Sequence, residues 1–431
     1  MLPKSELERL LPAEPALANH CRRVSALALE IAGALLVPQR WLPVLEQSAL
    51  LHHYPRVLFR PQAVGHLIAD VFAKPGSLRP MPKHAFRNTL PETIEAVLSN
   101  FHSRPADGLT PNIRRLSSIL ELSNLLDEQL ELLRFEPKPM SQVWAGLREL
   151  SGWIDPPVFE AARALFGAPQ MDLSRVTQDL PVQATVAEEV FRALAGQRSC
   201  DVMFLSVLAS RDPVLSGRLV QTANSALFSR NSAVRSVSQA ISYIGTDVAR
   251  KVLLAVALQP IFASVRLVHL WRHSVWMAQF CESLGHLTGF MDPEQALLLG
   301  LVHDVGRIAI QRAPRAAGIT YARLSERGCP PAYVEKLLFG KDHGEIGAEI
   351  LTAWNFPPDL IEAARFHHRP GESDSVGASA LYAAEFWAES DEDFPALSNL
   401  RAALRRTGFN STIFLQAAAR RSSLCDLLRV A

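Results

Sequence analysis

Apolar residues recur at three- and four-residue spacing through much of the chain, for example at Val24, Leu27, Ile31 and Leu35, and again over residues 113–120. This period places apolar side chains on one face of an α-helix. Alternating strand patterns joined by short Asn-Gly or Asp-Gly turns are nearly absent. Most of the 29 prolines fall between the helical segments, where they start or stop helices. We therefore predict an all-α fold.

Composition limits the function classes. The 431 residues are 48% apolar and 20% charged, which is typical of a folded globular chain with two or three domains. Lysine and arginine number 44 against 43 acidic residues, for a net charge of +1. Nucleic-acid binders normally carry a basic excess for phosphate contacts, so we expect no nucleic-acid partner.

Cysteine usage and the N-terminal sequence predict a compartment. The five cysteines lie far apart with no C-x-x-C pair, which excludes a zinc-finger or disulfide framework and favours a reducing environment. The first residues lack the charged start and apolar core of a signal peptide. The longest apolar stretch, residues 252–265, is too short for a membrane span and contains Gln259 and Pro260. We expect a cytoplasmic protein that does not bind membranes.

Histidines are concentrated in one part of the chain. Seven of the 13 lie within a hundred residues, namely His269, His273, His286, His303, His343, His367 and His368. His269 and His273 are four residues apart and share a helical face, and Asp304 follows His303 directly. Imidazole and carboxylate ligands suit Fe, Mn, Ni or Zn, and a carboxylate also supplies the charge that holds two ions together.

Several motifs of this region occur in a recognisable order. LPVQATVAEEVFRAL begins at Leu180, and LWRHS, GLVHDVGR, DHGEIGAEIL and ARFHH follow. The segment from Leu180 to about Ser390 resembles the HDOD domain of bacterial signalling proteins. The resemblance implies an all-helical domain on the HD phosphohydrolase scaffold with an additional N-terminal helical subdomain. It also implies a regulatory or output role.

The resemblance carries over to specific side chains. The residues that match HD ligand positions are His273, His303, Asp304, His343, His367 and His368. Glu385 stands where the last metal-binding Asp is expected, and Arg307 replaces a Lys. His303, Asp304 and Arg307 are the candidate catalytic residues. No GYP sequence follows His368, so cyclic-di-GMP recognition has no support. The alternative is that the same side chains form a buried polar network without an ion.

The first part of the chain resembles a degenerate HD-GYP domain. HCRRVSALALEIAGALL, QSALLHHYP, IEAVLSNFHSRPADG and SSILELSNLLDE carry that resemblance. His20 and His52 match ligand positions, and His102 lies in the segment of the later histidines. His53 and Asn124 replace the two carboxylates. Without anionic ligands we expect a catalytically inactive domain used for packing, partner contact or regulation.

These observations give one domain plan. Residues 1–166 form the degenerate HD-GYP-like domain, 167–180 a linker, 181–390 the HDOD domain, and 391–431 an acidic break followed by a basic helical segment. We expect a non-catalytic signalling module that acts through contacts with a signalling protein. The alternatives are a metal-dependent phosphohydrolase or cyclic-nucleotide phosphodiesterase, and nucleic-acid binding through the C-terminal arginines. The sequence leaves the partner and the oligomeric state open.

Overall fold

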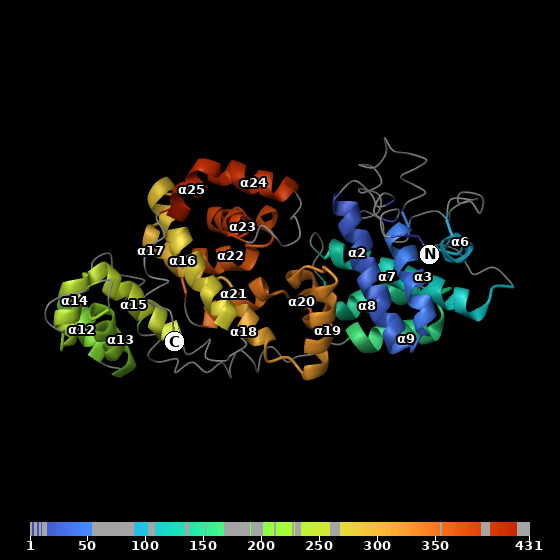
Figure 1. Cartoon of the computed structure of the whole chain (residues 1–431), viewed down its shortest axis with the longest axis horizontal. Helices are drawn as coiled ribbons and strands as arrows, with labels where there is room; N and C mark the ends of the chain where they lie inside the picture. Colours follow the sequence, from blue (N-terminus) through green and yellow to red (C-terminus); the bar gives the residue numbers. More distant parts are fainter. Residues whose placement is uncertain are drawn as a thin grey trace. The chain divides into compact units, whose positions relative to one another are not determined.

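The chain folds into α-helices. The computed structural model describes residues 15–53, 90–101, 108–133, 138–150, 152–167, 201–210, 213–225, 234–258, 268–353, 356–388 and 397–419, with a few isolated positions besides. These residues contain α-helices and short 3-10 turns and no strand, which confirms the all-α prediction (Figure 1). They form two compact units: residues 1–171 with 313–342, and residues 172–312 with 343–431. Each unit is described by itself below.

The first unit is built around two long helices. It contains α2 (Pro15–Ala34), η1 (Gln39–Trp41), α3 (Leu42–Leu51), α6 (Glu92–Ser99), α7 (Pro111–Leu132), α8 (Met140–Leu150), α9 (Pro156–Phe166), α19 (Arg315–Glu326) and α20 (Pro331–Phe339). Helix α2 packs against α3, α7 and α9. The predicted apolar face of α2 is buried at Val24, Leu27 and Ile31, whereas Leu35 lies just beyond the end of the helix.

A helix pair from the middle of the sequence belongs to this first unit. Helices α19 and α20, orange in Figure 1, are inserted between two segments of the second unit. Helix α19 packs on α2, and α20 packs on α7 and α9. The buried carboxylate of Glu30 on α2 forms an ion pair with Arg323 of α19 at 2.8 Å and a second ion pair with Arg327. The domain plan drawn from the sequence did not anticipate that residues 313–342 belong to the first unit.

Local sequence explains where many helices begin. Thr110 precedes α7, and its hydroxyl accepts the amide N–H of Ile113 at 3.4 Å. Proline occupies the first turn of α3, α7, α9, α20 and α22 (Pro358–Phe366). Backbone N–H groups in the first turn of a helix have no carbonyl partner within the helix, so proline, which lacks this N–H, loses no hydrogen bond there. Its ring also fixes φ at a helical value. Prolines therefore mark helix starts, as the sequence predicted.

The second unit contains the histidine-rich part of the chain. Its helices are α12 (Val202–Ser210), α13 (Pro213–Ala223), α14 (Val237–Ile244), α15 (Thr246–Leu258), α16 (Val268–Thr288), α17 (Pro293–Val302), α18 (Gly306–Ile310), α21 (His343–Ala353), α22, η6 (Pro370–Glu372), α23 (Val376–Ala388), α24 (Leu397–Thr407) and α25 (Ser411–Ala419). Helices α16 and α17 pair closely, and α21, α22 and α23 pack in succession. Phe414 of α25 stacks on Phe280 of α16 and Trp387 of α23, which closes this core.

Part of the C-terminal basic segment packs against other residues of the second unit. Arg406 of α24 donates hydrogen bonds to the carbonyls of Pro370 and Ser373, both at 2.7 Å, and to the hydroxyl of Ser379. The predicted linker from residue 168 onward and the acidic break at 389–396 lie outside the described residues. None of the described helices is long and apolar enough to cross a membrane.

Candidate metal centre

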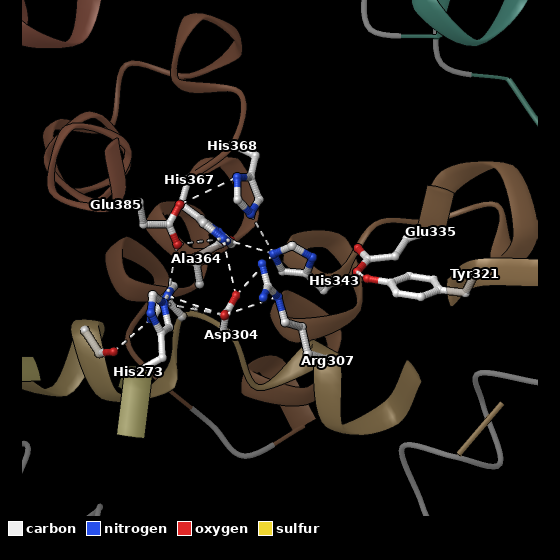
Figure 2. Close-up of polar contacts among 12 residues, drawn as sticks. His273, Asp304, Arg307, Tyr321, Glu335, His343, Ala364, His367, His368 and Glu385 are labelled. Carbon is white, nitrogen blue, oxygen red and sulfur yellow. Dashed lines mark hydrogen bonds and ion pairs between the residues drawn. The ribbon is translucent and has the colours of Figure 1, made fainter. Parts of the chain in front are cut away.

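The predicted ligands of the second unit come from five segments of the chain. Helix α16 supplies His273, the turn after α17 supplies His303 and Asp304, and α21 begins with His343. The end of α22 carries the remaining two histidines, and α23 carries Glu385. Figure 2 shows the labelled members of this cluster, His273, Asp304, His343, His367, His368 and Glu385, pointing toward one another. The structure thus brings together every residue that the sequence named for this cluster.

Two glycines allow the helices to approach closely enough. A Cβ on Gly300 of α17 would lie 2.5 Å from the carbonyl oxygen of Met277 on α16. A Cβ on Gly306 of α18 would lie 2.0 Å from the carbonyl oxygen of His343 on α21. Only a hydrogen atom fits at either contact. The first approach sets His273 beside His303, and the second sets Asp304 beside His343.

Asp304 lies at the centre of the cluster. One carboxylate oxygen is 3.1 Å from His343 Nε2 and 3.6 Å from His367 Nε2. The other is 3.7 Å from His303 Nε2 and 3.8 Å from His273 Nε2. Both oxygens are fully buried, and among the described residues their nearest polar neighbours are the His343 imidazole, 3.1 Å from one oxygen, and the Arg307 guanidinium, 3.2 Å from the other. Asp304 therefore belongs to two ligand groups, one with His343, His367 and His368 and one with His273, His303 and Glu385.

Glu385 supplies the second carboxylate. Its Oε1 lies 3.1 Å from His303 Nε2 and 3.8 Å from His367 Nε2, and its Oε2 lies 3.6 Å from His368 Nδ1. Glutamate is one methylene longer than the aspartate that the resemblance led us to expect. The sequence could not show whether this longer side chain faces the histidines, and the structure places it among them.

Backbone carbonyls fix the orientation of two imidazoles. His303 Nδ1 donates to the carbonyl of Gly300 at 2.8 Å, and His367 Nδ1 donates to the carbonyl of Ala364 at 2.6 Å. Each ring therefore carries a proton on Nδ1 and turns its Nε2 inward, where the nitrogen presents a lone pair whenever the ring is neutral. His343 Nε2 lies 3.2 Å from His367 Nε2, so inward-facing nitrogens converge. This arrangement is typical of histidines that bind a metal.

The charges of the cluster favour deprotonated carboxylates. Burial opposes ionisation of Asp304, but Arg307, whose Nε lies 3.2 Å away, and the neighbouring histidines hold its pKa well below the usual range. Burial likewise opposes ionisation of Glu385, and His368 and His367 outweigh it and lower its pKa. Both groups are therefore anionic near neutral pH, as metal ligands must be.

The histidines themselves divide into two kinds. Burial lowers the pKa of His273 to about 4 and that of His368 well below its ordinary value, so both are neutral near pH 7. Burial also disfavours the charged form of His303, but Asp304 and Glu385 outweigh it and raise its pKa. Neutral imidazoles with two carboxylates form a ligand set suited to a divalent transition metal.

The predicted residues of the first unit also gather at one place. His20 of α2, Asn124 of α7, and His52 and His53, which follow α3, are all fully buried. His20 Nε2 lies 3.1 Å from His52 Nε2, which is 3.2 Å from the Asn124 side-chain oxygen. His102 lies outside the described residues.

Sequence reasoning missed one carboxylate of this first unit. Asp127 lies three residues after Asn124 on α7, and its Oδ2 accepts the Nδ1–H of His20 at 2.7 Å. Its oxygens also accept two hydrogen bonds from Arg23 and one from the hydroxyl of Tyr333. Burial opposes ionisation of Asp127, but Arg23 and His20 lower its pKa below the usual range. The one-turn spacing Asn124–Asp127 was the available signal, because both residues share a helical face.

Comparison with known proteins identifies an HDOD domain in the chain. The sequence model of the HDOD domain matches residues 180–370, which confirms the HDOD resemblance for that part of the chain. An uncharacterised protein of Treponema pallidum (strain Nichols) is 28% identical over 200 residues, which cover 44% of this chain and 38% of that protein. The match therefore spans less than half the length of this relative.

Two solved structures are similar to part of this chain. A protein provisionally named a phosphohydrolase, from Shewanella amazonensis SB2B, is 25% identical with a TM-score of 0.48, over 59% of this chain and 95% of its own. An HDOD domain protein with unknown function from Geobacter sulfurreducens is 22% identical with a TM-score of 0.44, over 58% of this chain and 97% of its own. The HD-GYP-like assignment of residues 1–166 stays a prediction.

Proposed function

We propose that this chain is a bacterial signalling protein that acts through protein contacts, and that its HDOD region binds divalent metal as a structural element. The observation that carries the proposal is the convergence of seven ligand side chains from five segments within a region that matches the HDOD domain. A metal ion held by these residues would cross-link α16, the α17–α18 turn, α21, α22 and α23. Metal loading would therefore set the rigidity of the whole helical core.

The ligand groups suggest how metal is held. Asp304 with three histidines offers one site, and Asp304 with His273, His303 and Glu385 offers a second. Because Asp304 has two oxygens and belongs to both groups, it can bridge two neighbouring ions. Imidazole and carboxylate donors together suit Fe, Mn, Ni or Zn.

Burial of the cluster favours a structural role over turnover. His303, Asp304, His343 and His367 have no exposed surface, and the exposed fraction of the Glu385 side chain is 10%. The His273 and His368 side chains are exposed by 16% and 29%. A substrate would reach the rim of the site through these two rings, whereas the central carboxylate is covered.

An exposed apolar pair offers a surface for protein contact. Met203 and Val207 lie four residues apart on one face of α12, with exposed fractions of 77% and 54%. Large apolar side chains that are neighbours on a solvent-facing helix are typical of interaction surfaces. We propose that the signalling partner binds α12.

A second candidate function is metal-dependent phosphodiester hydrolysis, with a cyclic nucleotide as one substrate class. The shared carboxylate and the position of Arg307, 27% exposed beside Asp304, favour it. Bound divalent ions would supply Lewis-acid polarisation of a phosphoryl oxygen. Arg307 would bind the phosphate, and the neutral His273 and His368 would line the entrance.

One experiment separates the two functions. The full-length chain is loaded separately with Mn, Fe, Ni and Zn, its bound metal is measured, and each form is assayed on phosphodiester substrates beside Asp304→Asn and His303→Ala. If the regulatory proposal is right, the wild-type chain binds metal, both variants lose this metal, and no form hydrolyses phosphodiesters faster than buffer alone. Turnover by the wild type that both variants abolish would establish the hydrolase instead. A folded wild-type chain that binds none of the four metals would overturn the metal-binding part of the proposal.

A further inference from the structure

Helices α19 and α20 form an insertion whose two ends meet at one backbone contact of the second unit. Helix α18 ends at Ile310 and α21 begins at His343, whereas residues 313–342 between them belong to the first unit. A Cβ on Gly306 of α18 would lie 2.0 Å from the carbonyl oxygen of His343, so the two backbones touch here. Asp304 lies just before this contact. The insertion therefore starts and ends within the HDOD cluster, that is, among the seven candidate ligands of the second unit.

The connections at the base of the insertion are short. Residues 311–314 join α18 to α19, and residues 340–342 join α20 to α21. Gly340 ends α20 in the left-handed conformation, with φ of 77°, and its N–H donates to the carbonyl of Lys336. Residues 340–342 can span roughly 10 Å at most. A displacement of α20 is therefore passed on to His343, which follows directly.

Polar side chains hold both inserted helices on the first unit. Arg323 of α19, and Arg327 at its end, form ion pairs with Glu30 of α2, whose exposed fraction is 3%. On α20, the Tyr333 hydroxyl donates to Asp127 of α7 at 2.5 Å. Removing the cations of a buried carboxylate is strongly destabilising, and release of α19 would return this carboxylate to water. The docked position therefore depends on complete ion pairs at Glu30.

We infer that docking of α19 and α20 on the first unit is coupled to the geometry of Asp304 and His343, and through it to metal binding by the HDOD cluster. With the helices docked, a carboxylate oxygen of Asp304 lies 3.1 Å from His343 Nε2. Release of the helices lets the base of the insertion open and this pair separate. Metal sites tolerate displacements of only about 0.2 Å, so release weakens metal binding.

The coupling acts in both directions. Whatever factor docking adds to the metal affinity, bound metal adds to the docking equilibrium. The first unit thereby regulates the ligand geometry of the second through the inserted helices. Only the metal part of this inference rests on the proposed function, because the link between docking and the base of the insertion is a property of the fold.

The double substitution Arg323→Ala/Arg327→Ala, called the release variant, tests the inference. It leaves Glu30 buried without these two cations while the helices are docked, and alanine preserves the helix propensity of α19. Adding Glu30→Gln removes the buried charge and should restore docking, because burying an amide costs less than burying a carboxylate. This rescue would not occur if the arginines only stabilised α19 itself.

Ser117→Ala is the matched control in the first unit. The Ser117 hydroxyl donates to the carbonyl of Val97, so the substitution also removes a buried hydrogen bond. On α7, Ser117 lies roughly 15 Å from Asp127, the residue that binds Tyr333. The control therefore destabilises the first unit without removing a contact of the inserted helices.

Amide hydrogen exchange of the full-length chain in EDTA reads the link without metal. In the release variant, amides of α18 and α21 should exchange roughly 5- to 150-fold faster than in the wild type, and the Glu30→Gln rescue and Ser117→Ala should not show this change. Faster exchange confined to α19, α20 and α2 would overturn the inference, and so would unchanged exchange in all these helices or the same change in Ser117→Ala. If the release variant does not fold, Tyr333→Phe should show the same pattern with a smaller change.

Metal titration tests the second part, with Mn(II) and with Zn(II) as separate probes. The release variant should bind the metal more weakly than the wild type, and saturating metal should slow exchange of wild-type α19 amides by the same factor. Equal metal affinity in the two chains would overturn the coupling and leave the proposed metal binding intact. A wild-type chain that binds neither ion would overturn the metal part, whereas the exchange comparison in EDTA would still decide the link between docking and the base of the insertion.

Discussion

The close approach of α18 and α21 at Gly306 provides the strongest test of how the fold builds the HDOD cluster. In Gly306→Ala the new Cβ would lie 2.0 Å from the carbonyl oxygen of His343 and 2.7 Å from the amide nitrogen of Gly347. Both atoms belong to helix backbone, so neither can rotate away. Ordinary contact begins near 3.4 Å, so the two helices must separate by more than about 1 Å.

The separation has an energetic and a geometric consequence. Overpacking of this kind destabilises by about 1–3 kcal/mol, and the better helix propensity of alanine offsets at most about 1 kcal/mol of it. The movement also lengthens the 3.1 Å contact between Asp304 and His343. Metal coordination tolerates displacements of only about 0.2 Å, so the variant should also bind metal more weakly.

Amide hydrogen exchange is the suitable assay, because it reports on the helices of one unit without assuming two-state unfolding of the whole chain. A loss of 2 kcal/mol corresponds to roughly 30-fold faster exchange of α21 amides. Gly217→Ala on α13 is the matched control in the same unit, because a Cβ there meets no atom within 4 Å. That control should be neutral or stabilising by up to about 1 kcal/mol. Wild-type exchange in Gly306→Ala would refute the reasoning.

The remaining predictions concern other parts of the chain. Asp127→Asn removes the carboxylate that pairs with the Nε of buried Arg23 and leaves this residue only its ion pair with Glu131, so the first unit should be destabilised by up to about 3–5 kcal/mol, measured as faster exchange in α2 and α7. Arg23 and His20 outweigh burial and lower the pKa of Asp127 in the folded chain. The stability that ionised Asp127 contributes is therefore complete above the unfolded-state pKa of about 4, and it is lost as the pH falls through the lower folded-state pKa. Acid titration of exchange should show this loss in the wild type and not in the Asn variant. Arg406→Ala leaves three oxygen acceptors without this donor and should lower the free energy of unfolding near η6 by about 1–3 kcal/mol, measured as faster amide exchange there. Unchanged exchange near η6 would mean that these hydrogen bonds do not stabilise the fold. Met203→Ser with Val207→Ser should leave folding intact and weaken partner binding by at least about tenfold, whereas the exposed Leu415→Ser control should not; equal binding of both variants would exclude α12 as the contact.

The sequence predicted the helical elements from apolar periodicity, and it named the clustered side chains of the HDOD region from a resemblance. Apolar periodicity reports which helix face is buried, and α7 buries Leu116, Ile119 and Leu120 as the pattern requires. The candidate ligands followed from the order of the motifs that resemble the HDOD domain; the structure places these side chains together, and metal binding by them stays a prediction. The resemblance named Glu385 as a candidate ligand, and only the packing of α23 against α22 shows that its side chain lies among the histidines.

The association of α19–α20 with the first unit could not be read from the sequence in the same way. Periodicity reports that a helix has a buried face and says nothing about which helix covers it, so residues 313–342 were assigned to the HDOD domain by continuity alone. The contacts that decide the matter, Tyr333 with Asp127 and Arg323 with Glu30, join positions about 200 and 290 residues apart. Because α20 ends only a few residues before His343, the segment that fixes His20 through Asp127 also leads directly into an HDOD ligand. A single short stretch of chain thus contributes to both histidine clusters.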